Sequence, residues 1–235
     1  MSKKQKNPII LFEGYKGGVG KSMVATAFVE YCKEKGIKVS LIDTDFTNPD
    51  LNAIYQQTEN CKVIDIDKID GGGWTELMDF ADSNDETIIC SMKAGSKQST
   101  EKNIDFIQTA LSQLNRPLVV FFVLGIQTQN AVLLKESIEL YSQAKFIAVK
   151  NMKNGEPDEF FIFDEAKENG AFEGVEEMIF PRVHARVALQ ITDSNKTVSE
   201  LLAGSDLRIG QRAALQTWIG QCSDRFDAFK SVIWG

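Results

Sequence analysis

Short apolar runs alternate along the chain with segments in which apolar residues recur at helical spacing. The runs typical of strands are Pro8–Glu13, Lys38–Asp43, Lys62–Ile66, Glu86–Cys90, Leu118–Leu124, Lys145–Lys150 and Met178–Phe180. Helical patterns cover 22–35, 74–81, 103–115, 129–142, 183–192, 197–203 and 207–230. Nearly continuous apolar strands separated by helices indicate a sheet that is buried on both faces. The pattern therefore predicts an α/β fold with a doubly wound, mainly parallel sheet flanked by helices.

The organisation of the chain predicts where its chemistry lies. Its 235 residues contain no seam rich in Pro, Gly and Ser, so we expect a single domain over 1–235. In doubly wound sheets, ligands bind beyond the carboxyl ends of the strands. Functional residues are therefore expected in the loops that follow the strands. The run Gly71–Gly73 has no such context and is expected to be a flexible loop.

The most specific motif is the glycine-rich segment from Gly14 to Ser22, between the first expected strand and the first expected helix. Glycines let the backbone curl so that several N–H groups point at one anion, and the helix dipole adds to the attraction. Lys21 would reach the β- and γ-phosphates of a nucleotide, and Ser22 would place its hydroxyl on Mg²⁺.

The segment from Lys16 to Ser22, with the sequence KGGVGKS, resembles the deviant Walker A motif of the ParA/MinD family of SIMIBI-class P-loop ATPases. This family includes partition proteins, division-site proteins and relatives of the nitrogenase iron protein. The resemblance implies catalytic roles for Lys16 and Lys21, with Lys16 contacting nucleotide across a dimer that encloses two ATP molecules. The residues implied to bind ATP here are Gly17, Gly18, Val19, Gly20, Lys21, Ser22 and Met23. One departure is Tyr15, where the ordinary motif has glycine.

The second expected strand ends in Asp43-Thr44-Asp45, which resembles the family's switch I. The resemblance implies that Asp45 orients the attacking water near Mg²⁺ and that Asp43 holds a metal-bound water or orients the loop. Ser22, Asp43 and Asp45 are therefore the candidate metal residues. The alternative is that both carboxylates only cap a turn before Pro49.

The expected switch II departs from the family pattern. The strand Glu86–Cys90 leads into Ser91, where the family has the Walker B aspartate, although Ala94 and Gly95 fit. Loss of that aspartate predicts weaker metal binding or slower turnover. Alternatively, the protein works through nucleotide binding alone.

The nucleobase is expected to lie against the loops that follow the last two strands. In relatives an asparagine after the corresponding strand forms a hydrogen bond with adenine, which makes Asn151 the first candidate here. Pro181 and Arg182, in the loop after the last strand, are the second-rank candidates. The segment has no N-K-x-D guanine signature, so ATP is favoured over GTP. His184 has no metal-ligand spacing to other residues and is expected at a helix surface.

Composition narrows the class of protein. There are 26 Lys and Arg against 33 Asp and Glu, which gives a net charge of −7, and 43% of residues are hydrophobic. This is typical of a soluble protein, so we expect a cytoplasmic location, and the acidic balance argues against a dedicated nucleic-acid binder. The four scattered cysteines form no C-x-x-C pair. An iron–sulfur relative would need a second cysteine near Cys90, and none is evident.

The last segment, Ser223–Gly235, places Phe226, Phe229, Val232 and Ile233 on one helical face. MinD-type proteins end in an amphipathic helix that docks on membranes. Here the flanking charges sum to zero, whereas a membrane-surface helix usually carries Lys and Arg. We therefore expect this helix to pack on the core.

Together these features predict a Mg-dependent ATPase with slow turnover that acts as a dimerisation switch. The resemblance implies use in partition, positioning or transfer of plasmid DNA or a cellular cargo, with a plasmid-maintenance or conjugal-transfer branch favoured. The expected partners are a second copy across ATP and an unidentified protein, with DNA left open and a membrane less favoured. The alternative is a nucleotide-binding scaffold with little or no hydrolysis.

Overall fold

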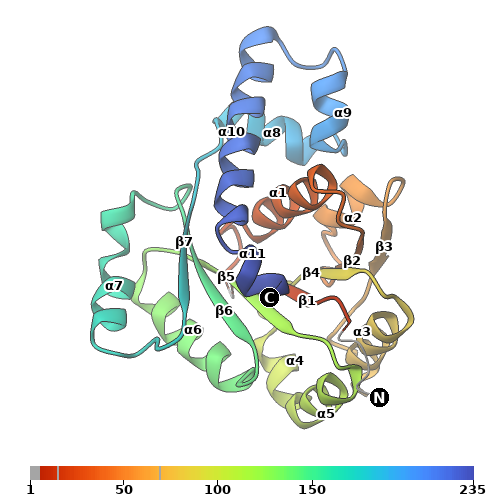
Figure 1. The fold of residues 1–235 in the computed structure, drawn as a ribbon, viewed down its shortest axis with the longest axis vertical. Helices are drawn as coiled ribbons and strands as arrows, with labels where there is room; N and C mark the ends of the chain where they lie inside the picture. Colours follow the sequence, from red (N-terminus) through yellow and green to blue (C-terminus); the bar gives the residue numbers. More distant parts are fainter. Residues whose placement is uncertain (1–5, 15, 69) are drawn as a thin grey trace.

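Parallel strands form the centre of the computed structural model, which describes residues 6–14, 16–68 and 70–235 (Figure 1). Within these residues the sheet has seven strands in the order β3-β2-β4-β1-β5-β6-β7. Their bounds are β1 Ile9–Glu13, β2 Val39–Asp43, β3 Asn60–Val63, β4 Thr87–Ser91, β5 Leu118–Leu124, β6 Lys145–Asn151 and β7 Glu176–Phe180. All six pairs of neighbouring strands in this sheet run parallel, which confirms the predicted fold class.

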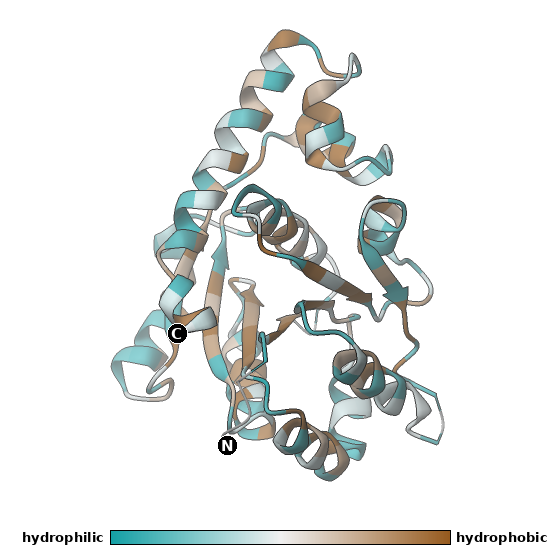
Figure 2. Ribbon diagram, turned by 45° about the vertical axis from the view of Figure 1, so that its right-hand side comes forward, coloured by the Kyte–Doolittle hydropathy of each residue, from teal (hydrophilic) through white to brown (hydrophobic). Residues whose placement is uncertain are grey.

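Alternate residues of each strand enter two separate apolar cores. In β1, Ile10 and Phe12 belong to one core, and Ile9 and Leu11 belong to the other. Successive side chains of a strand point to opposite faces, so a sheet covered on both sides must be apolar along its whole length. The brown strands lie between mixed teal and brown helices in Figure 2, as this arrangement requires.

One face of the sheet is covered by helices from both ends of the sequence. These are α1 Lys21–Glu34, α2 Asp50–Tyr55, α8 Ala185–Asp193, α9 Val198–Ala203, α10 Ile209–Asp227 and α11 Lys230–Trp234. Phe28 of α1 contacts Phe121 and Phe226, with ring centroids 5.4 Å and 5.0 Å apart. Phe226 and Ile233 are buried, while Phe229 and Val232 pack partly buried on the same core. The last helix therefore packs on the core, as predicted.

The other face is covered by the helices from the middle of the chain. These are α3 Gly72–Ser83, α4 Lys97–Lys102, α5 Ile104–Leu114, α6 Thr128–Leu140 and α7 Phe161–Glu168, with a short 3₁₀ turn at Pro157–Phe160. Trp74 of α3 is buried here, and its indole N–H donates to the Ser99 hydroxyl at 3.2 Å. In the described part of the chain, no helix is both long and apolar enough to cross a membrane.

The structure corrects two sequence predictions. The third strand is Asn60–Val63 rather than 62–66, because Ile64 and Ile66 continue past the strand into the core under α3. The expected flexible loop at Gly71–Gly73 is wrong, because Gly72 and Gly73 form the first turn of α3. A Cβ on Gly73 would overlap the Asp65 carbonyl and the Ile66 backbone, so this glycine permits close packing rather than flexibility.

Candidate functional site

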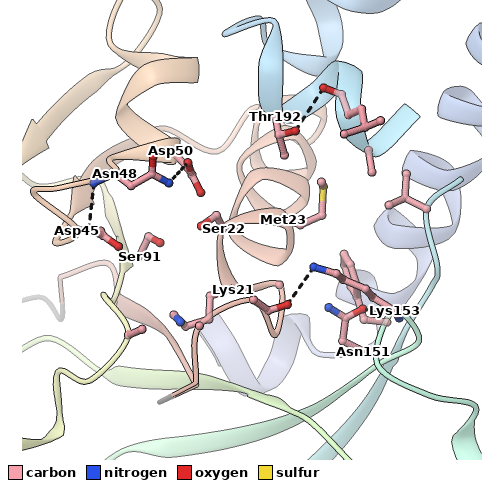
Figure 3. A pocket seen from close by; sticks show the side chains of 18 of the residues that line it. Lys21, Ser22, Met23, Asp45, Asn48, Asp50, Ser91, Asn151, Lys153 and Thr192 are labelled. Carbon is pink, nitrogen blue, oxygen red and sulfur yellow. Dashed lines mark hydrogen bonds between the residues drawn. The ribbon is translucent and has the colours of Figure 1, made fainter. Parts of the chain in front are cut away.

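The carboxyl ends of the central strands surround a cleft of about 720 Å³. The phosphate-binding segment follows β1, switch I follows β2, Ser91 ends β4, and the base-side loops follow β6 and β7. Figure 3 shows their side chains facing this cleft from both sides of α1. Of the predicted site residues, the cleft is lined by Gly17, Gly18, Gly20, Lys21, Ser22, Met23, Asp43, Asp45, Asn151, Pro181 and Arg182.

The glycine-rich segment leaves room for a ligand above its backbone. A Cβ placed on Gly17 or Gly18 would meet no atom within 4 Å. At Gly20 the reverse holds, because φ is +101° and a Cβ would strike the Asn151 amide. The segment is thus open toward the cleft and tightly packed behind it. This geometry fits a phosphate chain bound by backbone N–H groups.

Lys21 begins α1 on the floor of the cleft and is buried. Its ammonium donates to the Lys16 carbonyl at 3.3 Å. Burial lowers the pKa of Lys21, while the negative charges of Asp45 and Glu13 act in the opposite direction. An ammonium held in such a place interacts strongly with an anion that displaces the remaining water.

Lys16 and Val19 face a neighbouring groove of about 280 Å³ instead of the main cleft. The Lys16 ammonium donates to the side-chain oxygen of Gln127, at the start of α6. Val19 is buried, and its carbonyl accepts from the amides of Asn151 and Asn154 at 2.9 Å and 3.0 Å. Lys16 therefore points away from the nucleotide cleft of its own chain.

The two switch I carboxylates have different surroundings. Asp43 is buried, and its oxygens accept the N–H groups of Asp45, Leu51 and Asn52, so it caps α2. Burial raises the pKa of Asp43 to about 6 against these hydrogen bonds. The half-exposed Asp45 accepts the Thr47 hydroxyl at 2.7 Å and the Asn48 N–H at 3.1 Å. The capping geometry is therefore present at both positions, and their metal roles stay predictions.

Ser91 occupies the place at which the Walker B aspartate was expected. It ends β4 in register with Phe12 of β1 and Asp43 of β2, it is buried, and it lines the cleft. Thr44, which the sequence analysis gave no role, joins the two switches across this point. Its hydroxyl donates to the Ser91 carbonyl at 3.2 Å and accepts the Lys93 N–H at 2.8 Å. The Lys93 ammonium pairs with Asp67.

The base-side loops are fixed by hydrogen bonds to the glycine-rich segment. Asn151 is buried and accepts the Lys153 N–H at 3.0 Å, while the Lys153 ammonium donates to the Gly18 carbonyl at 2.9 Å. Arg182 donates to the Met152 carbonyl at 2.7 Å and pairs with Glu156 at 2.9 Å. His184 is exposed directly before α8, as expected.

Several cleft residues were not predicted. The sequence gives little indication of these residues. Lys153 is one of 20 lysines and has no distinguishing pattern around it, and the residues of α8 lie far from any motif. Asn48 and Asp50 fall within the switch I segment, so their position beside Asp45 was the easiest to find. The cleft is also lined by Asp50, which was expected to compensate for Ser91, and by Ala94 of the expected switch II. The unpredicted lining residues are Asn48, Met92, Lys153, Phe180, Val183, Ala185, Ala188, Leu189 and Thr192.

No group of three or more His, Cys, Asp or Glu side chains in the described residues is placed to hold a metal ion. Mg²⁺ often depends on one or two protein groups together with the phosphates of a nucleotide, and Ser22 and Asp45 line the cleft for that arrangement. Cys32, Cys90 and Cys222 are buried in the apolar cores, and burial raises the pKa of each thiol. The described cysteines thus assemble no iron–sulfur ligand set.

Comparison with known proteins supports what this geometry indicates. Residues 10–204 match the model of the CobQ/CobB/MinD/ParA nucleotide-binding domain. The chain belongs to this family. It is also 32% identical over 213 residues to Protein MobD of Acidithiobacillus ferrooxidans. The aligned region covers 89% of this chain and 92% of MobD.

Solved structures share the fold. MinD of Pyrococcus horikoshii, complexed with Mg-ADP, has a TM-score of 0.57 and 14% identity and covers 96% of this chain and 98% of its own. A ParA family ATPase from Chlorobium tepidum has a TM-score of 0.54 and 13% identity, with 92% and 98% covered. This family member therefore has the P-loop fold of MinD and ParA, and its domain is a nucleotide-binding domain of that type.

Proposed function

We propose that the protein binds Mg-ATP, hydrolyses it slowly and dimerises across the nucleotide. The observation that carries this proposal is the pair of lysines in one loop. Lys21 lies on the floor of the cleft, whereas Lys16 lies at its rim and points away from it. A lysine so placed is available to the nucleotide of a second copy, as the ParA/MinD resemblance implies.

Different residues of the cleft would bind the phosphates, the Mg²⁺ ion and the adenine of ATP. Gly17, Gly18 and Lys21 would hold the phosphates, Ser22 and Asp45 would hold Mg²⁺, and Asn151, Pro181 and Arg182 would contact the adenine. Mg²⁺, when bound, neutralises charge that develops on the phosphates. Asp45 would orient the attacking water, because its loop lies next to Lys21 and Ser22. The Ser91 hydroxyl contributes no negative charge, which supports slow turnover.

The cellular role that we propose is partition, positioning or transfer of plasmid DNA or another cargo, through an unidentified protein partner. The resemblance to the plasmid-maintenance or conjugal-transfer branch supports this role. The similarity to MobD, which spans most of both chains, is in keeping with it. A cytoplasmic location follows from such a role.

The decisive measurement is the solution mass of the protein by sedimentation, with no nucleotide, with Mg-ADP and with Mg-ATP. We expect a monomer that becomes a dimer with Mg-ATP alone. Lys21→Ala should lose nucleotide binding, whereas Lys16→Ala should bind ATP and stay monomeric. Lys102→Ala, on the exposed surface of α4, is the matched control and should dimerise normally. Normal ATP-dependent dimerisation of Lys16→Ala would contradict the proposal.

A nucleotide-binding scaffold without useful hydrolysis is the second candidate, favoured by Ser91 at the Walker B position. The two candidates differ in the response to Ser91→Asp. For a slow ATPase, the new carboxylate should support Mg²⁺ and raise the rate of phosphate release by about tenfold, equivalent to about 1.4 kcal/mol of barrier. For a scaffold, neither the wild type nor the variant should release phosphate above background. Ser91→Asn, which adds similar volume without charge, is the control.

A further inference from the structure

The arginines of this acidic protein are concentrated in one part of the chain. The sequence has 20 lysines, spread over its length, but only six arginines, and five of these lie between Arg182 and Arg225 together with the single histidine. The sixth, Arg116, is buried and donates to backbone carbonyls that include those of Asn7 and Asn84. The remaining guanidinium groups therefore belong to the segment that forms β7 to α10.

Three of these five guanidinium groups form no ion pair with a described carboxylate. Among the described residues, Arg182 pairs with Glu156, and Arg212 donates to the Gly204 carbonyl, but Arg186, Arg208 and Arg225 form no ion pair. Some lysines of the chain do pair with carboxylates, as Lys35 does with Asp227 and Lys196 with Asp206. These three arginines are exposed, so their charges face solvent and are open to a partner.

The fold gathers two of the three into one groove. A cavity of about 580 Å³ between the start of α8 and the start of α10 is lined by His184, Arg186, Arg208, Gly210, Gln211 and Ala214. No acidic side chain lines it. It lies beside the cleft at the carboxyl ends of the strands, but the two cavities share no lining residue. It is a shallow depression that is open to solvent, which suits an extended peptide better than an enclosed small molecule.

An apolar side chain stands in the same turn. Ile209 follows Arg208 at the start of α10, and 90% of its surface is exposed, the largest fraction among the large hydrophobic residues described. An isoleucine next to an arginine offers apolar contact and charge-assisted hydrogen bonds at one place. Side chains of this combination recognise a partner that presents both a carboxylate and an apolar group.

We propose that this groove, which we call the Arg186/Arg208 groove, binds an acidic segment of a partner protein that places an apolar side chain against Ile209. A nucleic acid fits less well. Binding of duplex DNA rests on many phosphate contacts, whereas this groove offers two guanidinium groups in a molecule of net charge −7. The exposed isoleucine also has no counterpart on a phosphate backbone. The proposal does not depend on dimerisation or on ATP hydrolysis.

The test is selection of peptides from a phage-displayed library of random 12-residue sequences on the full-length wild type, without nucleotide. The same library is counter-selected on the charge-reversal variant Arg186→Glu/Arg208→Glu. We expect enriched peptides that are rich in Asp and Glu and contain an aliphatic or aromatic residue. By fluorescence anisotropy, charge reversal should weaken their binding by at least about tenfold, because like charges then face each other. Ile209→Ser should weaken it by about threefold or more.

The controls separate this groove from general electrostatics and from misfolding. Lys102→Glu/Lys135→Glu reverses two exposed charges on α4 and α6, on the other face of the sheet, and should keep binding within about twofold of wild type. Should the reversal variant not fold, Arg186→Gln/Arg208→Gln takes its place. The proposal is overturned by enriched peptides without net negative charge, by no enrichment, by equal binding to the reversal variant, or by a 24-base-pair duplex DNA that binds this groove instead.

Discussion

At the scale of single residues, Glu13 is the most unusual side chain near the site. It ends β1 directly before the glycine-rich segment and is fully buried. The Ser137 hydroxyl donates to its Oε2 at 2.6 Å, and Tyr141 lies against the same carboxyl group. Burial raises the pKa of Glu13 to about 7, because the hydrogen bonds and the charge of Lys21 offset the lost hydration only in part.

This raised pKa predicts a pH-dependent stability difference between the wild type and Glu13→Gln. Above pH 4.5 the unfolded chain releases the Glu13 proton, whereas the folded protein keeps it until about pH 7. The wild type therefore loses stability as the pH rises through this window, and the amide does not. Urea unfolding from pH 5 to pH 8 should show the variant gaining about 2–3 kcal/mol relative to wild type.

The sequence predicted individual site residues well where a motif fixed them. Lys21, Ser22, Asp45 and Asn151 all line the cleft, because each lies at or shortly beyond the carboxyl end of a strand, while their roles stay predictions. It could not predict the direction of a side chain. That Lys16 contacts Gln127 depends on how α6 packs against the glycine-rich segment, and a spacing pattern does not contain that information.

At the scale of elements, the long and periodic segments were predicted, whereas several short helices were not. The helix α1 was expected within one residue of its bounds and the short α9 was also expected, but α2, α4 and α7 were missed. A helix of six to eight residues has few apolar positions, so its period is weak. Its stability comes from tertiary contacts, such as the Asp43 carboxylate that caps α2.

Replacing one glycine in each of two helices by alanine should have opposite effects on stability. Gly73 opens α3 where a Cβ would overlap the Asp65 carbonyl, so Gly73→Ala should lower the free energy of unfolding by about 2 kcal/mol or more. Gly220 lies inside α10, where a Cβ would meet no atom within 4 Å. Gly220→Ala should therefore raise the free energy of unfolding by about 0.5–1 kcal/mol. Chemical denaturation of both variants measures the two effects, and equal effects would contradict the packing described for Gly73.

At the scale of the whole molecule, the overall composition did not reveal the local positive charge of the Arg186/Arg208 groove. The net charge of −7 argued against a dedicated nucleic-acid binder, but an average over the chain does not locate a local basic patch. The order of strands was likewise beyond the sequence pattern, which indicated parallel strands without their neighbours. The buried network between α1, α2 and α9 is a further example. There, Tyr55 and Ser199 both donate to the Glu30 carboxylate at 2.8 Å.

Ligand binding should stabilise the whole fold in proportion to occupancy. At a Mg-ATP concentration 100 times its Kd, the free energy of unfolding should rise by about 2.7 kcal/mol. For a chain of this length we expect the melting temperature to rise by about 5–10 °C. Lys21→Ala should abolish the shift, and Lys102→Ala should keep it. Differential scanning fluorimetry measures all three proteins, and an unchanged shift in Lys21→Ala would remove that lysine from the proposed phosphate site.

The central place of β1 also has a consequence for the making of the protein. Ile9 pairs with Ile88 on one side and with Leu118 on the other, and Pro181 closes the far side of the cleft. The glycine-rich segment therefore leaves the ribosome long before Pro181 and the other residues that complete the cleft. At about 5–20 residues per second, the interval is roughly ten to thirty seconds. Nucleotide can thus enter only a nearly finished chain, and the early strands must be kept from aggregating without it.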